Sequence, residues 1–248
     1  MKPVLLVRND RYESFGVAPG ALAWAGVDVL TANATDHTVD LPPLSNIAGV
    51  VTFGGTVNVD QVHAHPHLAR VREYTCEAVG RGVPYLGICL GSQILARASG
   101  VDVVRGPVRE VGFEPVRPTA AAADDALLSF LEDEEPALQW HEDTHELPEG
   151  AILLVTGDEI PLQGYRIGDR AWGIQFHLEV DEPMVDRWLR IPGNRKEIEE
   201  LNGKIDPDRI RKETHEYISR LKELSDKSFA GFIGFFGFNK KRQSLPSR

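Results

Sequence analysis

Residues 84–93, PYLGICLGSQ, contain the pattern that decides the fold. The apolar run Tyr85–Ile88 predicts a buried strand, and Ser92–Ser99 predicts a short helix, so Cys89 lies at a strand-to-helix turn. Glycines stand two residues before and after Cys89, where a Cβ atom would collide with its neighbours in so tight a turn. Gly-x-Cys-x-Gly in this setting is the thiol form of the elbow that lifts a nucleophile above the carboxyl edge of a sheet.

The position of Cys89 also bears on its chemistry. The N-terminus of a helix favours thiolate over thiol, and the thiolate is the form that attacks a carbonyl carbon. A buried cysteine in a glycine-flanked turn is the plainer interpretation, but the strand before it and the helix after it favour a nucleophile. The other cysteine, Cys76, falls on an expected helix and is interpreted as a small core residue.

The first hundred residues contain several further apolar, β-branched runs. Continuous rather than alternating runs predict strands buried on both faces, which is typical of a parallel sheet covered by helices. Residues 66–82 predict one of those helices. The expected class is α/β: a doubly wound, mostly parallel sheet with helices on both faces. Its expected strands are Val4–Val7, Val27–Leu30, Ile47–Phe53, Val83–Ile88 and Val101–Val104.

The second half of the chain has shorter strand-like runs with connections too short for crossover helices. These runs are expected to pair largely antiparallel and to extend the main sheet. Asp181 followed by Glu182 and Pro183 predicts an N-cap and a helix that continues to about Arg190. The expected strands are Phe113–Arg117, Ala137–Trp140, Ile152–Val155, Leu162–Ile167 and Ala171–Phe176.

Charge divides the chain in two. Of the 27 basic and 37 acidic side chains, 13 and 28 lie in residues 1–189, a net charge of −15, and 14 and 9 lie in residues 190–248, a net charge of +5. We therefore expect a main domain over residues 1–190 and a distinct C-terminal appendage over residues 191–248. The net charge of −10 argues against nucleic acid as a partner, because a polyanion is repelled by an acidic surface.

The appendage predicts an amphipathic helix over about 207–225, followed by a Phe/Gly-rich tail at 229–238 and the basic end Lys240–Arg242. The helix and tail are expected to pack on the main domain or to join two copies of the chain, with a synthetase or a membrane surface as less favoured partners. Deleting residues 229–248 is expected to leave the fold intact and to change solubility or association. No stretch is long enough to span a membrane, and the start of the chain lacks a signal peptide, so a cytoplasmic protein is expected.

Two segments could complete a site around Cys89. His177 and Glu179 are two residues apart at a strand end, so they face the same side and the carboxylate can hold the imidazole in one tautomer. Gly54 and Gly55 follow a buried strand, where the backbone N–H groups of Gly55 and Leu90 could bind an oxyanion. Each pattern alone is weak, and together with the elbow they predict acyl transfer by a thiol nucleophile.

Other histidines and acids are weaker candidates. His63, His65 and His67 alternate as metal ligands could, but no carboxylate or cysteine accompanies them at a matching spacing, so no metal and no cofactor is expected. His141 and His145, each followed by a glutamate, are expected on a loop that closes over the site and takes no part in the chemistry.

These segments together resemble a known family. Phe53-Gly54-Gly55, Gly87–Gln93 and His177–Glu179 match class I glutamine amidotransferases in order and approximate spacing, and the segments Arg105–Gly112, Gln139–Thr144 and Ala171–His177 resemble stand-alone GMP-synthase-like amidotransferases. The resemblance covers about residues 3–190. It departs from the family at Leu178 and Thr56, where relatives usually have proline.

The resemblance implies a flavodoxin-like amidotransferase fold and hydrolysis of the side-chain amide of L-glutamine to glutamate and ammonia. Cys89 would attack, His177 would move the proton to ammonia, Glu179 would orient His177, and Gly54 and Gln93 would contact the substrate. The ammonia would pass to a separate synthetase or acceptor enzyme, or the chain would act alone, because it has no P-loop or ATP-pyrophosphatase motif. A γ-glutamyl hydrolase with the same triad, and a non-catalytic subunit that docks to a partner, are the alternatives.

Overall fold

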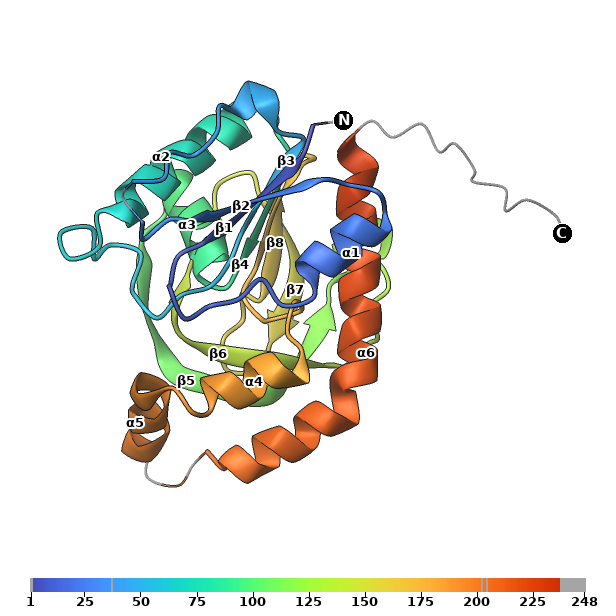
Figure 1. The fold of residues 1–248 in the computed structure, drawn as a ribbon. Coiled ribbons are helices and arrows are strands. Elements are labelled where there is room, and N and C mark those ends of the chain that lie inside the picture. Colours follow the sequence, from blue (N-terminus) through green and yellow to red (C-terminus); the bar gives the residue numbers. More distant parts are fainter. Residues whose placement is uncertain (1, 37, 202, 204, 237–248) are drawn as a thin grey trace, which may run out of the picture.

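The computed structural model describes residues 2–36, 38–201, 203 and 205–236, and within them the chain folds around one mixed sheet (Figure 1). The strand order is β2-β1-β3-β4-β9-β8-β7-β5-β6. The strands are β1 (Val4–Arg8), β2 (Val29–Asn33), β3 (Gly49–Thr52), β4 (Tyr85–Ile88), β5 (Val103–Pro118), β6 (Glu135–His145), β7 (Ile152–Gly157), β8 (Gly164–Ile167) and β9 (Ala171–Ile174).

Helices connect and cover these strands. The α-helices are α1 (Ala18–Trp24), α2 (His67–Gly80), α3 (Leu90–Ala98), α4 (Glu182–Trp188), α5 (Pro192–Glu200) and α6 (Pro207–Ile233). Short 3₁₀ turns lie at η1 (Leu44–Asn46), η2 (Ala120–Asp124) and η3 (Gly234–Phe236). The expected caps are present, since the side chains of Asp181 and Asp206 accept backbone N–H bonds from Met184 and Asp208 at the starts of α4 and α6.

Strand β1 shows why the sheet needs helices on both faces. Val4 and Leu6 belong to one core cluster, with residues of α1 and α6, and Leu5 and Val7 belong to another, with residues of α2 and α3. All four side chains are at most 1% exposed. Successive side chains of a strand point to opposite faces, so an unbroken apolar run is buried only between two layers. The predicted doubly wound α/β fold with an antiparallel extension is confirmed.

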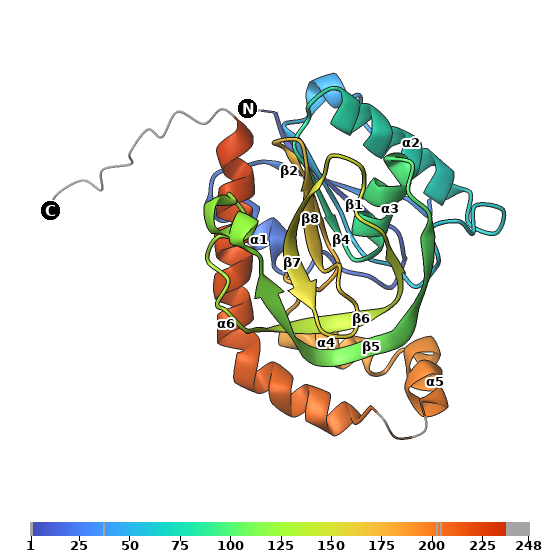
Figure 2. The same cartoon turned by 180° about the vertical axis from the view of Figure 1, so that it is seen from behind.

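Two strands pair differently from expectation. Residues 101–104 were expected to form another parallel strand, but β5 begins at Val103, pairs antiparallel with β6, and leaves Val104 54% exposed. In the second half, β9 is antiparallel to β8 but parallel to β4, so it joins the two parts of the sheet. The reverse view shows the curved β5–β6 pair extending beyond the main sheet, near α4 and α5 (Figure 2).

Helix α6 is longer than the predicted 207–225. It continues to Ile233 because Phe229 and Phe232, both 0% exposed, are buried in the core cluster that contains Val4 and Leu6. Gly231 allows this approach, since a Cβ there would lie 2.0 Å from the backbone oxygen of Ala126. The apolar stripe of its first half also packs within the chain, as when Tyr217 contacts Phe113 at 5.2 Å between ring centroids. Residues 237–248, with the rest of the Phe/Gly tail and the basic end, lie outside the described residues.

Candidate active site

Cys89 lies where β4 ends and α3 begins, in a backbone conformation that only steric necessity explains. Its φ is 53° and its ψ −112°, and among the described residues it is the one non-glycine with positive φ. Such a conformation costs on the order of 1–3 kcal/mol and persists only where its surroundings fix it. They do so here, because the N–H of Cys89 donates to Ile174 O at 2.8 Å and its carbonyl accepts the N–H of Ser92 at 2.9 Å.

The two flanking glycines have a measurable reason. A Cβ on Gly87 would lie 2.3 Å from Gly91 O, and one on Gly91 would lie 2.0 Å from Thr52 O. Backbone atoms cannot yield to such contacts, so the turn admits no side chain at either position. The sequence argument for the Gly-x-Cys-x-Gly elbow is therefore reproduced in atomic detail.

His177 and Glu179 follow β9 and form a buried pair. Nδ1 of His177 lies 2.9 Å from Oε1 of Glu179, and the two residues are 3% and 1% exposed. The main chain holds both, since His177 N–H donates to Leu138 O at 2.8 Å and Val17 N–H donates to Glu179 O at 2.9 Å. Burial lowers the pKa of His177, but the charges of Glu179 and Cys89 outweigh it and raise that pKa well above 6.5.

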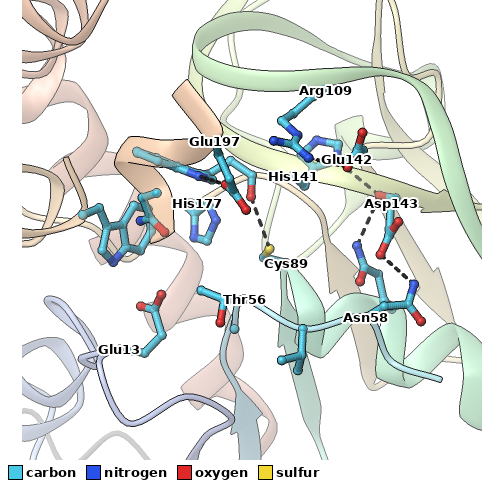
Figure 3. A pocket seen from close by; sticks show the side chains of 16 residues that line it. Glu13, Thr56, Asn58, Cys89, Arg109, His141, Glu142, Asp143, His177 and Glu197 are labelled. Carbon is cyan, nitrogen blue, oxygen red and sulfur yellow. Dashed lines mark hydrogen bonds and ion pairs between the residues drawn. The ribbon is translucent and has the colours of Figure 1, made fainter. Parts of the chain in front are cut away.

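The three side chains meet beside Gly54. A Cβ on Gly54 would lie 3.4 Å from Cε1 of His177 and 3.9 Å from Sγ of Cys89. The Cys89 thiol is also 3.9 Å from the backbone oxygen of Trp140. The structure thus brings together the predicted nucleophile, the imidazole and the carboxylate, and a side chain on Gly54 would crowd the space between the first two (Figure 3).

The predicted oxyanion loop runs close to the start of α3. A Cβ on Gly55 would lie 2.9 Å from Cδ2 of Leu90, so only glycine lets the two segments approach. The loop is fixed on its outer side by Asn9, which donates to Phe53 O at 2.8 Å, and by Thr56, whose hydroxyl donates to Asp10 at 2.6 Å. Thr56 therefore anchors the loop at a position where relatives usually have proline.

Gln93 lies one turn into α3 and is 4% exposed. Its Nε2 donates to Asp143 O and to Gln175 Oε1, both at 3.2 Å. Asp143 in turn accepts from Nδ2 of Asn58 at 2.7 Å. These bonds fix Gln93 at the wall of the pocket that contains Cys89 and His177.

That pocket has a volume of about 140 Å³, well below the roughly 300–1,000 Å³ of pockets for drug-sized ligands. It suits a substrate of the size of one amino acid. Of the predicted site residues, Gly55, Cys89, Gln93 and His177 line it, whereas Gly54, Leu90 and Glu179 lie behind the wall. The remaining lining residues are Glu13, Thr56, Val57, Asn58, Arg109, Trp140, His141, Glu142, Asp143, Trp188, Asn194 and Glu197.

Several lining residues could not be found from the sequence. Asn194 and Glu197 lie on α5, a helix that the sequence analysis did not predict although Pro192 stands at its first position. Glu13 lies in the loop after β1, where no motif singles it out. Burial raises the pKa of Glu13 to about 7, against the opposing charge of His177.

Two tryptophans form the aromatic wall of the pocket. The Trp188 ring packs edge-on against His177, with 4.7 Å between ring centroids, and Trp140 packs edge-on against Trp188 at 5.7 Å. Trp188 is 2% exposed. Edge-to-face pairs of this kind fix ring positions and exclude water from what they cover.

The segment with His141 differs from the expected loop. Residues 135–145 form strand β6, and His141 is held in it with Nε2 2.9 Å from Oε2 of Glu110. It lines the pocket, so this segment is a fixed wall and not a closing loop.

The remaining predictions concern cysteine and metal. Cys76 is exposed and not a core residue, because it lies on the outer face of α2. Within residues 2–36, 38–201, 203 and 205–236, no three His, Cys, Asp or Glu side chains gather as a metal ion would require. His65 and His67 contact each other through their rings, with centroids 5.9 Å apart.

Comparison with known families decides the assignment. The family model described as glutamine amidotransferase class-I matches residues 21–186. The chain belongs to this family. The class I amidotransferase segment thus spans α1 to α4, including Cys89, His177 and Glu179.

Relatives of this amidotransferase are of two kinds. The chain is 26% identical over 199 residues to the glutamine amidotransferase-like protein YfeJ of Salmonella typhimurium, covering 78% of this chain and 82% of that protein. It is 36% identical over 156 residues to the GMP synthase [glutamine-hydrolyzing] of Leifsonia xyli subsp. xyli, covering 60% of this chain. That match spans only 28% of the GMP synthase, so it leaves most of the longer protein without a counterpart here.

Solved amidotransferase structures match nearly the whole chain. A glutamine amidotransferase from Thermotoga maritima superposes with a TM-score of 0.85 at 25% identity, covering 96% of this chain and 100% of that one. A glutamine amidotransferase from Methylobacillus flagellatus gives a TM-score of 0.83 at 25% identity, with 99% of each chain covered. The described helices of this amidotransferase include none that is long and apolar enough to cross a membrane.

Proposed function

We propose that this chain hydrolyses the side-chain amide of L-glutamine through a γ-glutamyl thioester on Cys89, releasing glutamate and ammonia. The observation that carries the proposal is the strained Cys89 elbow placed beside the buried His177–Glu179 pair at a small pocket. Family membership supplies the reaction class, and the geometry supplies the residues that would perform it.

The pair of Cys89 and His177 is suited to nucleophilic attack. The raised pKa of His177 favours imidazolium beside thiolate, and the N-terminus of α3 stabilises the thiolate further. Sγ attacks the amide carbon, and the C–N bond breaks once the imidazolium proton passes to the departing nitrogen. Water then attacks the thioester, His177 takes its proton, and glutamate leaves as Cys89 is restored.

Charge that develops on the amide oxygen needs donors that do not have to reorganise. The backbone N–H groups of Gly55 and Leu90 supply them, because the Gly54–Gly55 loop and the start of α3 approach each other where no Cβ fits. Glu179 keeps Nδ1 of His177 occupied so that Nε2 serves the reaction. Gln93 would bind the amino-acid end of the substrate from the opposite wall.

The fate of the ammonia depends on other proteins. Amidotransferase domains that sit within longer GMP synthases cover about a quarter of those proteins, and this chain matches only that portion. Ammonia from this chain would pass to a separate synthetase or to an acceptor enzyme. The reaction proposed for the chain itself, however, is complete without one.

The test measures glutamate and ammonia released from L-glutamine by the purified chain. Wild type and Cys76→Ala should release both products in equal amounts, and Cys89→Ala should release neither. Cys76 is the matched control because it is the other cysteine of the chain and is exposed on α2. Hydroxylamine added during turnover should be converted to γ-glutamyl hydroxamate, since it intercepts a thioester. Equal release by Cys89→Ala would contradict the proposal.

A further inference from the structure

The walls of the pocket differ in character on the two sides of Cys89. Figure 3 shows Glu13, His177 and Glu197 on one side of Cys89, and Asn58 and Asp143 on the other. The second side is the one that Gln93 completes by its bond to Asp143 O. The first side contains the aromatic pair Trp140 and Trp188.

The side with His177 is where a leaving group must be. In acyl transfer the imidazole that gives up its proton has to reach the departing nitrogen, so the leaving group occupies the His177 side of the nucleophile. Trp188 packs directly on His177, and Glu13 feels the charge of His177. Ammonia needs none of these groups for recognition, because it has no further atoms to contact.

Charge compensation also differs between the carboxylates that line the pocket. Glu142 is paired with Arg109, at 2.6 Å, and with Arg105. Asp143 accepts from the Asn58 amide at 2.7 Å.

Glu13 and Glu197, by contrast, form no ion pair with a lysine or arginine within the described part of the chain. Glu197 accepts only the weak 3.4 Å bond from the Trp140 ring N–H and interacts with Arg109 at longer range. Burial raises the pKa of Glu13 to about 7, a cost that a bound cation would relieve. Two uncompensated carboxylates beside two tryptophan rings form an environment that attracts an organic ammonium group.

We propose that Glu13, Glu197, Trp140 and Trp188 form a subsite for a positively charged amine, so that the chain cleaves γ-glutamyl amides of diamines in preference to those of neutral amines. This inference rests on the proposed function, since it uses the same nucleophile and the same thioester. It adds the chemical class of the leaving group.

The chemistry balances without a further reactant. Sγ of Cys89 attacks the γ-carbonyl carbon, the bond from that carbon to the amine nitrogen breaks, and the proton of His177 goes to that nitrogen. The free diamine leaves with its distal ammonium held by Glu13 and Glu197 until release. Water hydrolyses the thioester and glutamate follows.

The test compares three substrates: L-glutamine, the γ-glutamyl amide of a butane diamine, and that of butylamine. The last two have the same chain length and differ in the terminal ammonium. For wild type, kcat/KM should be at least about tenfold higher for the diamine amide, the scale of one partly buried charge contact. Glu13→Gln and Glu197→Gln should each lower this ratio by several-fold, and Glu13→Lys should bring it below one.

Glu199→Gln is the matched control, because Glu199 lies on the same helix α5 with a side chain that is 71% exposed. Its ratio should equal that of wild type. Each ratio is measured within one preparation, so partial misfolding of a variant lowers both rates and leaves the ratio unchanged.

Equal kcat/KM values for the two amides, or a ratio that both Gln variants preserve, would overturn the amine subsite. Turnover of glutamine without turnover of either amide would also overturn it while leaving the proposed function intact. Silence on all three substrates would overturn the proposed function, and this inference with it.

Discussion

Nδ1 of His177 lies 2.9 Å from Oε1 of Glu179, and the two side chains are 4% and 1% exposed. Both follow β9, the strand that joins the parallel and antiparallel parts of the sheet. A carboxylate this deeply buried is stable only with a partner, and here the partner is the ring that faces Cys89. The pair therefore links the topology of the sheet to the proposed proton transfer.

Glu179→Gln tests this link. The amide cannot stabilise imidazolium and can favour the wrong tautomer, so we expect kcat for glutamine to fall by about 10³–10⁴-fold. The charge of Glu179 raises the pKa of His177, so an NMR titration should show a lower pKa in the variant. Glu149→Gln, at an exposed loop position, is the control and should alter neither value. Unchanged kcat in Glu179→Gln would remove Glu179 from the mechanism.

Gly91→Ala tests the steric argument for the elbow. The new methyl group would lie 2.0 Å from Thr52 O, so the turn must shift, and we expect a loss of at least about 1–3 kcal/mol in the free energy of unfolding. Gly20→Ala is the matched control within helix α1, where nothing lies within 4 Å of the added atom. It should raise the free energy of unfolding by about 0.5–1 kcal/mol. Urea denaturation of both variants measures the difference, and equal stabilities would refute the steric account.

Phe232→Ala tests whether the end of α6 belongs to the core. The ring is 0% exposed and packs with Trp172 and Phe236, so its removal should cost about 3–5 kcal/mol. Trp24→Ala removes a larger side chain that is 94% exposed and should change stability by less than about 0.5 kcal/mol. By the same reasoning, deletion of residues 229–248 should destabilise the fold, contrary to what the composition suggested. A stable Phe232→Ala variant would show that α6 is dispensable.

Glu13 should make stability depend on pH. Its pKa is raised from 4.5 to about 7, so between these values the native state holds a proton that the unfolded chain releases. The free energy of unfolding must therefore fall as pH rises through that window. Glu13→Gln should flatten the fall between pH 4.5 and 7, measured by urea denaturation across that range. His177 contributes above 6.5, so the lower half of the window isolates Glu13. Identical slopes in both proteins would show that Glu13 titrates normally.

The sequence predicted the parts of the molecule that follow from local rules. The Cys89 elbow needs particular residues at fixed spacing, and the strands of the parallel sheet need unbroken apolar runs, so both could be read directly. The Asp181 and Asp206 caps are equally local. Roles of individual site residues remain predictions until the variants are measured.

What the sequence could not reveal depends on contacts between distant segments. Glu13 enters the pocket because the loop after β1 passes beside β9, 164 residues away in the case of His177. Phe232 is buried because α6 returns to β1, although a run of Phe and Gly resembles a loose tail. Val104 looks like a buried strand residue but falls on a twisted hairpin with one face in solvent.

The most direct test of the central claim is mass spectrometry of the intact chain, quenched in acid during turnover of L-glutamine. The account predicts a species heavier than the free chain by one glutamyl group, with the added mass on the peptide that contains Cys89. Cys76→Ala should show the same species, and Cys89→Ser should not show a thioester. Glutamine turnover with no adduct on Cys89, under conditions in which hydroxylamine also traps nothing, would contradict the thioester mechanism.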